Sequence, residues 1–214
     1  MHLLNSEMKR MIISALFLCG LYITAAAQGT SVLEQLCAKM TEQAAVMNYS
    51  YTLAMSGVKN TGEGSLTVQD NFYVMNGNGL NIWCNGYTLW VMDQPGKEIL
   101  IDSVSQEADS YMSNPALLLS RVTSVFNVAS PVVSGTSLTY SLTPKSYCGI
   151  SSGVITLDAS GQSVVFVSGS FKTSDGGQLD IKIKSMTFEK KKPLTFYVLD
   201  LSGFDSSWMI TDLR

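Results

Sequence analysis

The chain has 214 residues, of which 46% are hydrophobic and 14% are charged, and its formal net charge is −3. This composition excludes general disorder, and the length suits one domain with a substantial core. A mildly acidic chain also argues against binding to nucleic acid or to anionic membranes, because both rely on clustered Lys and Arg.

The N-terminus has the pattern of a cleaved signal peptide. Lys9 and Arg10 precede an apolar run at residues 11–23, and three alanines follow at residues 25–27. The apolar run is shorter than the roughly 20 residues that a membrane span needs. We therefore expect residues 1–27 to be removed and the protein to be exported to the periplasm of a Gram-negative-type envelope.

Four cysteines are spread along the chain without metal-type spacing. Cys19 raises the alternative of a lipid-modified cysteine, but bulky residues precede it where a lipobox needs small ones. Cys37 suits the apolar side of a helix as a small buried residue. Cys84 and Cys148 either form a disulfide in an oxidising compartment or stay free, and the sequence leaves both alternatives open.

The first structured element is expected to be a helix. Ser31 and Glu34 have the spacing of a capping box, and Asn48 is a suitable end. The apolar residues in between recur at helical spacing and predict one buried stripe that packs across a sheet. These residues are Leu33, Leu36, Cys37, Met40, Ala44 and Met47.

After this helix, apolar and polar residues alternate with the period of a half-buried strand. Short runs bounded by Gly, Asn, Asp or Pro indicate an antiparallel meander. We expect strands over residues 49–55, 64–69 (a series that Phe72 and Val74 continue), 80–84, 87–92 and 98–101. An Asn85-Gly86 turn precedes the last two strands, and a Pro95-Gly96 turn joins them.

A second helix is predicted over residues 114–121, with Asn114 capping it and Pro115 at its first position. Its three consecutive leucines must cover something apolar. Residues 122–131 either extend this helix or form a second segment.

Strands are then expected over residues 137–143, 153–158, 163–170 and 178–188, followed by a terminal pair over residues 194–199 and 208–213. In total, we expect about ten or eleven strands and two or three helices. The sequence thus predicts one mostly β (α+β) domain over residues 28–214.

Two segments carry a resemblance to a known family. Asn85-Gly86-Tyr87-Thr88-Leu89-Trp90 is similar to the turn and Leu-Trp strand of LolA-type periplasmic lipoprotein carriers. Asn114-Pro115-Ala116-Leu117-Leu118-Leu119 is similar to their Pro-Leu-Leu helix. The order of the expected elements agrees over residues 31–213. The resemblance implies an incomplete antiparallel β-barrel with an N-terminal helix and short lid helices over its open side.

The resemblance also implies a function. Such carriers hold the acyl chains of lipoproteins in an apolar cavity and move them from the inner to the outer membrane. The expected partners are lipid-modified proteins, an inner-membrane releasing complex and an outer-membrane acceptor, and the carrier is expected to be a monomer. One departure concerns lid control, because residues 49–58 contain no arginine where well-studied carriers have one, and the next basic residue is Lys59.

The expected site follows from these assignments, although the sequence does not say which face of the sheet lines the cavity. For Trp90 we favour structural packing, with cavity lining as the alternative. The lid helix is expected to contribute Pro115, Leu117, Leu118 and Leu119. The cavity is expected to be lined by Tyr51, Leu53, Met55, Leu66, Val68, Phe72, Val74, Leu89, Trp90, Ile99 and Ile101.

No residue pattern indicates catalysis. The only histidine is His2, which lies in the expected signal peptide, so triads and zinc centres that use histidine are not expected. Ser56 and Lys59 match Ser-x-x-Lys, but without the accompanying motifs. We expect no enzymatic activity, cofactor or metal. Two alternatives to lipoprotein transport are another exported lipid or glycolipid binder, and an interaction protein whose barrel is filled. The lysine run at residues 190–192 suits either a solvated loop or a docking site.

Overall fold

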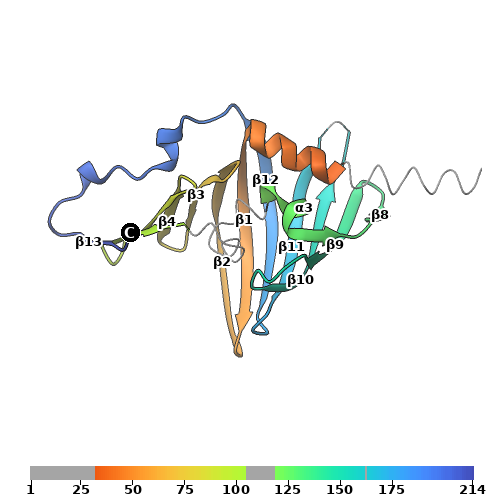
Figure 1. Ribbon diagram of the computed structural model, residues 1–214, viewed down its shortest axis with the longest axis horizontal. Helices are drawn as coiled ribbons and strands as arrows, with labels where there is room; N and C mark the ends of the chain where they lie inside the picture. The colour runs from red at the N-terminus through yellow and green to blue at the C-terminus, as the bar shows by residue number, and fades with distance from the viewer. Residues whose placement is uncertain (1–31, 105–118, 162) are drawn as a thin grey trace, which may run out of the picture.

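The structure is a computed structural model that describes residues 32–104, 119–161 and 163–214. These residues contain thirteen strands in one sheet, in the order β13-β6-β5-β4-β3-β2-β1-β12-β11-β10-β9-β7, with β8 paired to β9. Figure 1 shows this sheet curled into an open half-barrel. The mostly β fold and the incomplete barrel are therefore confirmed, with more strands than the sequence predicted.

The strands of the first half form an antiparallel meander. They are β1 (Ala44–Met55), β2 (Val58–Gln69), β3 (Phe72–Gly77), β4 (Leu80–Cys84), β5 (Thr88–Asp93) and β6 (Glu98–Ser103). Ser56 and Gly57 join β1 to β2 with φ values of 52° and 80°. Positive φ at both central residues defines the type I′ turn, whose twist matches that of the flanking strands.

The segment that joins β4 to β5 has the turn predicted from its sequence. The Asn85 side chain accepts hydrogen bonds from the backbone N–H groups of Tyr87 (3.1 Å) and Thr88 (2.8 Å). Gly86 has a φ of 83°, a value that a side chain would oppose. β5 and β6 then pair antiparallel, with Trp90 opposite Ile101, so the predicted strand pair is confirmed.

The second half completes the sheet. Its strands are β7 (Phe126–Val128), β8 (Val132–Ser134), β9 (Ser137–Pro144), β10 (Ile150–Asp158), β11 (Val165–Thr173), β12 (Gln178–Glu189) and β13 (Met209–Asp212). β12 pairs with β1 and joins the two halves. The pairing includes a bulge near Asn48 and Tyr49.

The N-terminal helix is shorter than predicted. Residues 32–42 are helical, and β1 already begins at Ala44, so Ala44 and Met47 belong to a strand. Both are fully buried. Because successive residues at the start of β1 are covered on both faces, the strand lacks the alternation that would have marked it. Ser31 of the expected capping box lies outside the described residues.

The region of the predicted lid is only partly described. Pro115, Leu117 and Leu118 lie outside the described residues. Leu119 is helical and packs against the core that the N-terminal helix covers. Residues 122–131 form a separate segment, with the short helix α3 (Val122–Val125) followed by β7. No helix in the described part of the chain is long and apolar enough to cross a membrane.

The sequence predicted a C-terminal pair of strands, of which only the second, over residues 208–213, is present, as β13; residues 194–199 are not a strand. Residues 194–199 contain the 3₁₀ turn η2 (Leu194–Tyr197), which is closed by a hydrogen bond from the Phe196 N–H to the Pro193 carbonyl (2.9 Å). A second turn, η3 (Leu201–Gly203), follows. β13 pairs with β6, and in parallel, in a sheet whose other pairs are antiparallel.

Candidate apolar binding face

The pairing of the strands defines two faces of the sheet, because residues directly opposite each other in antiparallel strands point to the same side. Met47 lies opposite Leu66, Leu66 opposite Met75, Met75 opposite Ile82, and Ile82 opposite Val91. This row belongs to the side that helix 32–42 and α3 cover, which faces the viewer in Figure 1. We call it the concave face and the other side the convex face.

One end of the concave face is a solid core. Helix 32–42 lies across it and buries its apolar stripe there (Figure 1). The buried side chains come from both halves of the sheet, so this core joins them. They include Leu33, Leu36, Met40, Met47, Leu66, Val68, Tyr73, Phe126, Tyr140, Leu142, Leu157 and Phe166.

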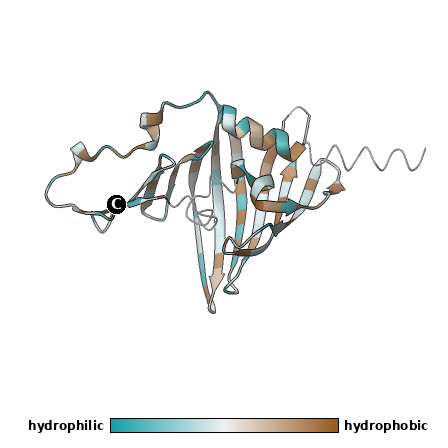
Figure 2. Cartoon of the chain, viewed as in Figure 1, coloured by the Kyte–Doolittle hydropathy of each residue, from teal (hydrophilic) through white to brown (hydrophobic). Residues whose placement is uncertain are grey.

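The opposite end of the concave face carries partly exposed apolar side chains. Tyr51 and Leu53 of β1 lie opposite Ile181 and Leu179 of β12, and Leu179 lies opposite Phe171 of β11. All five are only partly buried. Figure 2 shows brown segments alternating with paler ones along these strands. We call these five residues the open apolar face.

Glycines let the rings of this region lie flat against the sheet. A Cβ added to Gly62 would lie 2.7 Å from Cε1 of Tyr51, and one added to Gly64 would lie 3.0 Å from the Tyr49 hydroxyl. The Tyr51 hydroxyl accepts a hydrogen bond of 2.7 Å from Nδ2 of Asn78, which fixes the ring. The two rings therefore lie over the backbone of β2.

Phe171 has the same arrangement on the other half. Added Cβ atoms at Gly153 and at Gly169 would each lie 2.8 Å from its ring. A ring that lies along the sheet projects little into the concave space. The open apolar face therefore presents flat rings and aliphatic side chains, which suit a flexible apolar chain better than a rigid polar ligand.

The convex face is polar over the central strands. Glu63 forms an ion pair with Lys184, and Ser170 donates a hydrogen bond of 2.6 Å to Asp180 that lowers the pKa of this carboxyl group. Two shallow hollows of about 550 and 640 Å³ lie over β12, β1 and β2, the second also reaching β3, and polar side chains of this face line most of each. Such polar hollows do not suit acyl chains.

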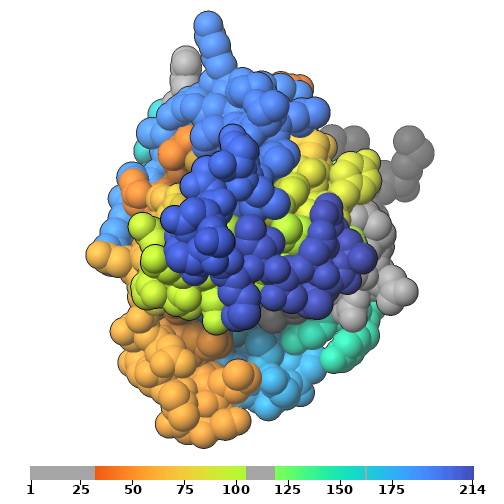
Figure 3. Space-filling view, turned by 90° about the vertical axis from the view of Figure 1, so that its left-hand side faces the viewer, coloured from red at the N-terminus to blue at the C-terminus, as the bar shows by residue number. Residues whose placement is uncertain are grey.

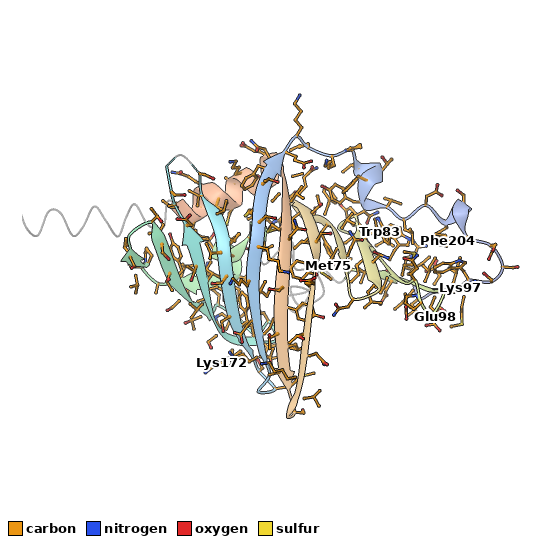
Figure 4. The ribbon with its side chains drawn as sticks, turned by 180° about the vertical axis from the view of Figure 1, so that it is seen from behind. Met75, Trp83, Lys97, Glu98, Lys172 and Phe204 are labelled. Atoms are coloured by element: carbon orange, nitrogen blue, oxygen red, sulfur yellow. The ribbon has the colours of Figure 1, made fainter. Side chains whose placement is uncertain are left out.

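The convex face of β3 to β6 is apolar instead, and the C-terminal segment covers it. Trp90, Ile99 and Ile101 are buried there against a partly buried set that includes Phe204 and Trp208. The space-filling view shows this blue segment lying across the yellow-green strands (Figure 3). Trp83 and Phe204, both labelled in the view from behind, each pack against this buried cluster (Figure 4).

The structure separates the predicted lining residues into two groups. Leu66 and Val68 share the concave face with the exposed or half-exposed Tyr51, Leu53, Met55 and Leu89, but are buried in the core. The remaining five lie on the convex face, where neighbours in the sheet and the C-terminal segment pack against them, so they cannot line the same concavity. These are Phe72, Val74, Trp90, Ile99 and Ile101.

Sequence reasoning missed part of the site on the other half of the sheet. Phe171, Leu179 and Ile181 complete the open apolar face from β11 and β12. The alternation of Leu179, Ile181 and Ile183 with charged residues was the signal that could have found them. It marked a strand with one apolar side, but the pairing of β12 with β1 was needed to place that side next to Tyr51.

The described cysteines are buried free thiols, so Cys84 and Cys148 do not form a disulfide. Burial raises the pKa of the Cys37 and Cys84 thiols to about 11, which keeps them protonated and unreactive at neutral pH. No cluster of His, Cys, Asp or Glu suited to a metal ion occurs in the part of the chain that the structure describes.

The sheet and its faces define a class of protein, an open half-barrel with an apolar concave side. No protein-family model matches the chain, and no curated protein matches it in sequence. Its fold is similar to that of an uncharacterized conserved protein from Thermus thermophilus, with a TM-score of 0.52 and 7% identity over 86% of this chain and 99% of that chain.

Two further solved structures are similar in fold at lower scores. A LolA superfamily protein from Nitrosomonas europaea matches with a TM-score of 0.44 and 11% identity, over 80% of this chain and 97% of that chain. An outer membrane lipoprotein-sorting protein domain from Vibrio parahaemolyticus matches with 0.42 and 10%, over 85% and 96%. At these identities the likeness is one of fold alone.

Proposed function

We propose that the protein is an exported, non-enzymatic carrier that shelters acyl chains against its open apolar face. The observation that supports this proposal is the contrast between the two sides of the central strands. Tyr51, Leu53 and Ile181 are partly exposed apolar residues on the concave side, whereas the charged residues Glu63, Asp180 and Lys184 occupy the convex side. A half-barrel that keeps such an apolar side open has an energetic reason to bind an apolar ligand.

The energetics of acyl chains suit this geometry. Removing each CH₂ group from water contributes about 0.8 kcal/mol, so a lipid anchor with several chains is effectively bound to a membrane. A carrier must replace much of that contact and still release its cargo. Non-directional contact with flat rings and aliphatic side chains meets both needs, because it carries no hydrogen bonds that must be broken on release.

The cargo that we propose is a lipid-modified protein, moved through the periplasm from the inner to the outer membrane. The signal-peptide pattern of residues 1–27 supports export, and the resemblance at residues 85–90 supports this cargo. An inner-membrane releasing complex and an outer-membrane acceptor belong to the same proposal. A lipid or glycolipid carrier on this fold would use the same face, so the cargo is a separate test.

Binding is tested by two neighbouring substitutions on β1. Leu53 lies on the concave face and Thr52 on the convex face, and both are half-buried. We expect Leu53→Asn to weaken binding of a fluorescent fatty acid about tenfold, because burying a leucine side chain contributes about 1.5–3 kcal/mol. Thr52→Asn should bind like the wild type. Equal affinity of all three proteins, or no binding by the wild type, would contradict the proposal.

The cargo is tested by the protein's own contents and by its loss. Native mass spectrometry of the protein from its periplasm should show lipid-modified proteins bound. Depletion of the protein should leave outer-membrane lipoproteins in the inner membrane. Bound free lipid together with normal lipoprotein sorting would favour the lipid or glycolipid carrier. An interior without any lipid would favour the interaction protein.

A further inference from the structure

Residues 190–198, which follow β12, form a turn that combines lysines with exposed apolar residues. Lys190, Lys191 and Lys192 come first, and Pro193 and η2 follow. We call residues 190–198 the C-terminal turn. In Figure 1 it lies at the top of the molecule, beyond the end of β12 and on the side of β3.

The C-terminal turn is held in place by two residues of the convex face. The Gln69 carboxamide accepts a hydrogen bond of 2.8 Å from the Lys192 N–H and one of 3.4 Å from the Tyr197 hydroxyl. The Tyr197 ring is fully buried, and its centroid lies 5.6 Å from that of Phe72. The turn is therefore a fixed part of the sheet surface.

Because Tyr197 points inward, its neighbours point outward. Leu194 is 61% exposed, Phe196 40% and Val198 39%. Single exposed apolar residues are common, but a group of three on one short, anchored segment is typical of a surface that contacts another apolar phase.

The surroundings of these residues are basic. Lys190 and Lys191 are exposed, and Nζ of Lys192 lies 5.7 Å from the centroid of the Phe196 ring. Lys39 of helix 32–42 lies over the ring of Phe188, near the same end of β12. Of these lysines, Lys192 forms an ion pair with Glu189. The fold thus gathers positive charge here, although the chain as a whole is acidic.

We propose that the C-terminal turn docks the protein on anionic lipid surfaces. Lys190 and Lys191 face the phosphate groups, and Leu194 and Phe196 enter the boundary between headgroups and acyl chains. Basic and apolar side chains next to each other are the usual composition of such an interfacial contact. These apolar side chains are exposed on the outside of the turn, where a fluid lipid surface can close around them without the matching pocket that a protein partner would need.

This surface differs from the open apolar face in position and in ligand. It lies beside the convex face, at the end of the sheet that carries helix 32–42, and it binds a membrane surface rather than a single extracted chain. A failure of the docking proposal would leave the acyl-binding proposal intact, because the two use different residues and different assays.

Cosedimentation with lipid vesicles tests the proposal. The wild type should bind vesicles that contain phosphatidylglycerol and should bind pure phosphatidylcholine vesicles much more weakly. Each lysine near an anionic surface strengthens binding about fivefold, so Lys190→Gln with Lys191→Gln should weaken it by a factor of about thirty. Leu194→Ser with Phe196→Ser should weaken it at least about tenfold.

Matched controls come from the far parts of the molecule. Lys172→Gln with Lys182→Gln removes the same charge from β11 and β12, and Figure 4 shows Lys172 at the opposite end of the sheet from η2. Val133→Ser removes an apolar side chain on β8 that is 57% exposed, close to the value for Leu194.

These controls should retain vesicle binding. Equal losses in controls and C-terminal turn variants would overturn the proposal, as would a wild type that ignores phosphatidylglycerol. Binding of the turn to an acidic protein without any binding to vesicles would overturn it as well.

Discussion

Tyr197→Ala tests whether one buried ring holds the C-terminal segment on the convex face. The ring is fully buried between Phe72 and Phe196, with centroid distances of 5.6 and 5.1 Å. Truncation of a buried aromatic residue to alanine typically costs about 3–5 kcal/mol. We expect the free energy of unfolding to fall by that amount. Phe196→Ala, at a partly exposed neighbour in the same turn, should cost less than about 1.5 kcal/mol.

The measurement is urea unfolding followed by tryptophan fluorescence, with limited proteolysis of the folded protein. The midpoint of Tyr197→Ala should fall while its m-value stays unchanged. Proteolysis should begin within residues 190–208. Tyr197→Phe keeps the ring and loses only the hydrogen bond to Gln69, so it should cost about 0.5–1.5 kcal/mol. If Tyr197→Ala destabilises the protein no more than Phe196→Ala does, the ring is not the anchor.

Three further predictions concern the core and the sheet. Gly64→Ala should destabilise the protein by about 1–3 kcal/mol, because the added Cβ would lie 2.0 Å from the Asn76 carbonyl oxygen. Gly203 has open space around it, so Gly203→Ala should be nearly neutral in the same unfolding assay. The free energy of unfolding should fall as the pH rises from about 9 to 11. Burial raises the pKa of the Cys37 and Cys84 thiols from 9.0 to about 11, so the unfolded chain loses these protons at a lower pH than the folded protein does. Constant stability over this range would contradict the burial of the two thiols. Adding a reductant at neutral pH should leave the unfolding midpoint unchanged, because Cys84 and Cys148 are free thiols, and a lower midpoint would indicate a disulfide between them.

Most strands could be predicted because their exposed residues are polar. In β9 and β12, apolar side chains alternate with polar ones, so the period of two was visible. The start of β1 could not be found in this way. Ala44 and Met47 are three residues apart and both buried, which is also the pattern of a helix, and only tertiary packing distinguishes the two.

The faces of the sheet were harder to predict than its strands. Alternation shows that Leu89 and Trp90 point to opposite sides, but it does not show which side is concave. That depends on long-range contacts, because Trp90 is covered by residues that follow it by more than a hundred positions, such as Phe204. The run at residues 194–199 misled for a related reason. Its apolar residues form a surface turn anchored by Tyr197. Several of them are exposed, so their apolar character did not indicate a buried strand.

The parallel pairing of β13 with β6 has a consequence for the folding order. Met209 aligns with Glu98, so more than a hundred residues separate the partners, and the backbone groups along that side of β6 stay unpaired until β13 has been synthesised. Contacts between such distant residues form late, because a long loop must close first. Until then, this unpaired edge is a template for strand pairing between chains. We therefore expect the pairing of β13 with β6 to be a late folding step, and the chain to aggregate most readily before this pairing forms.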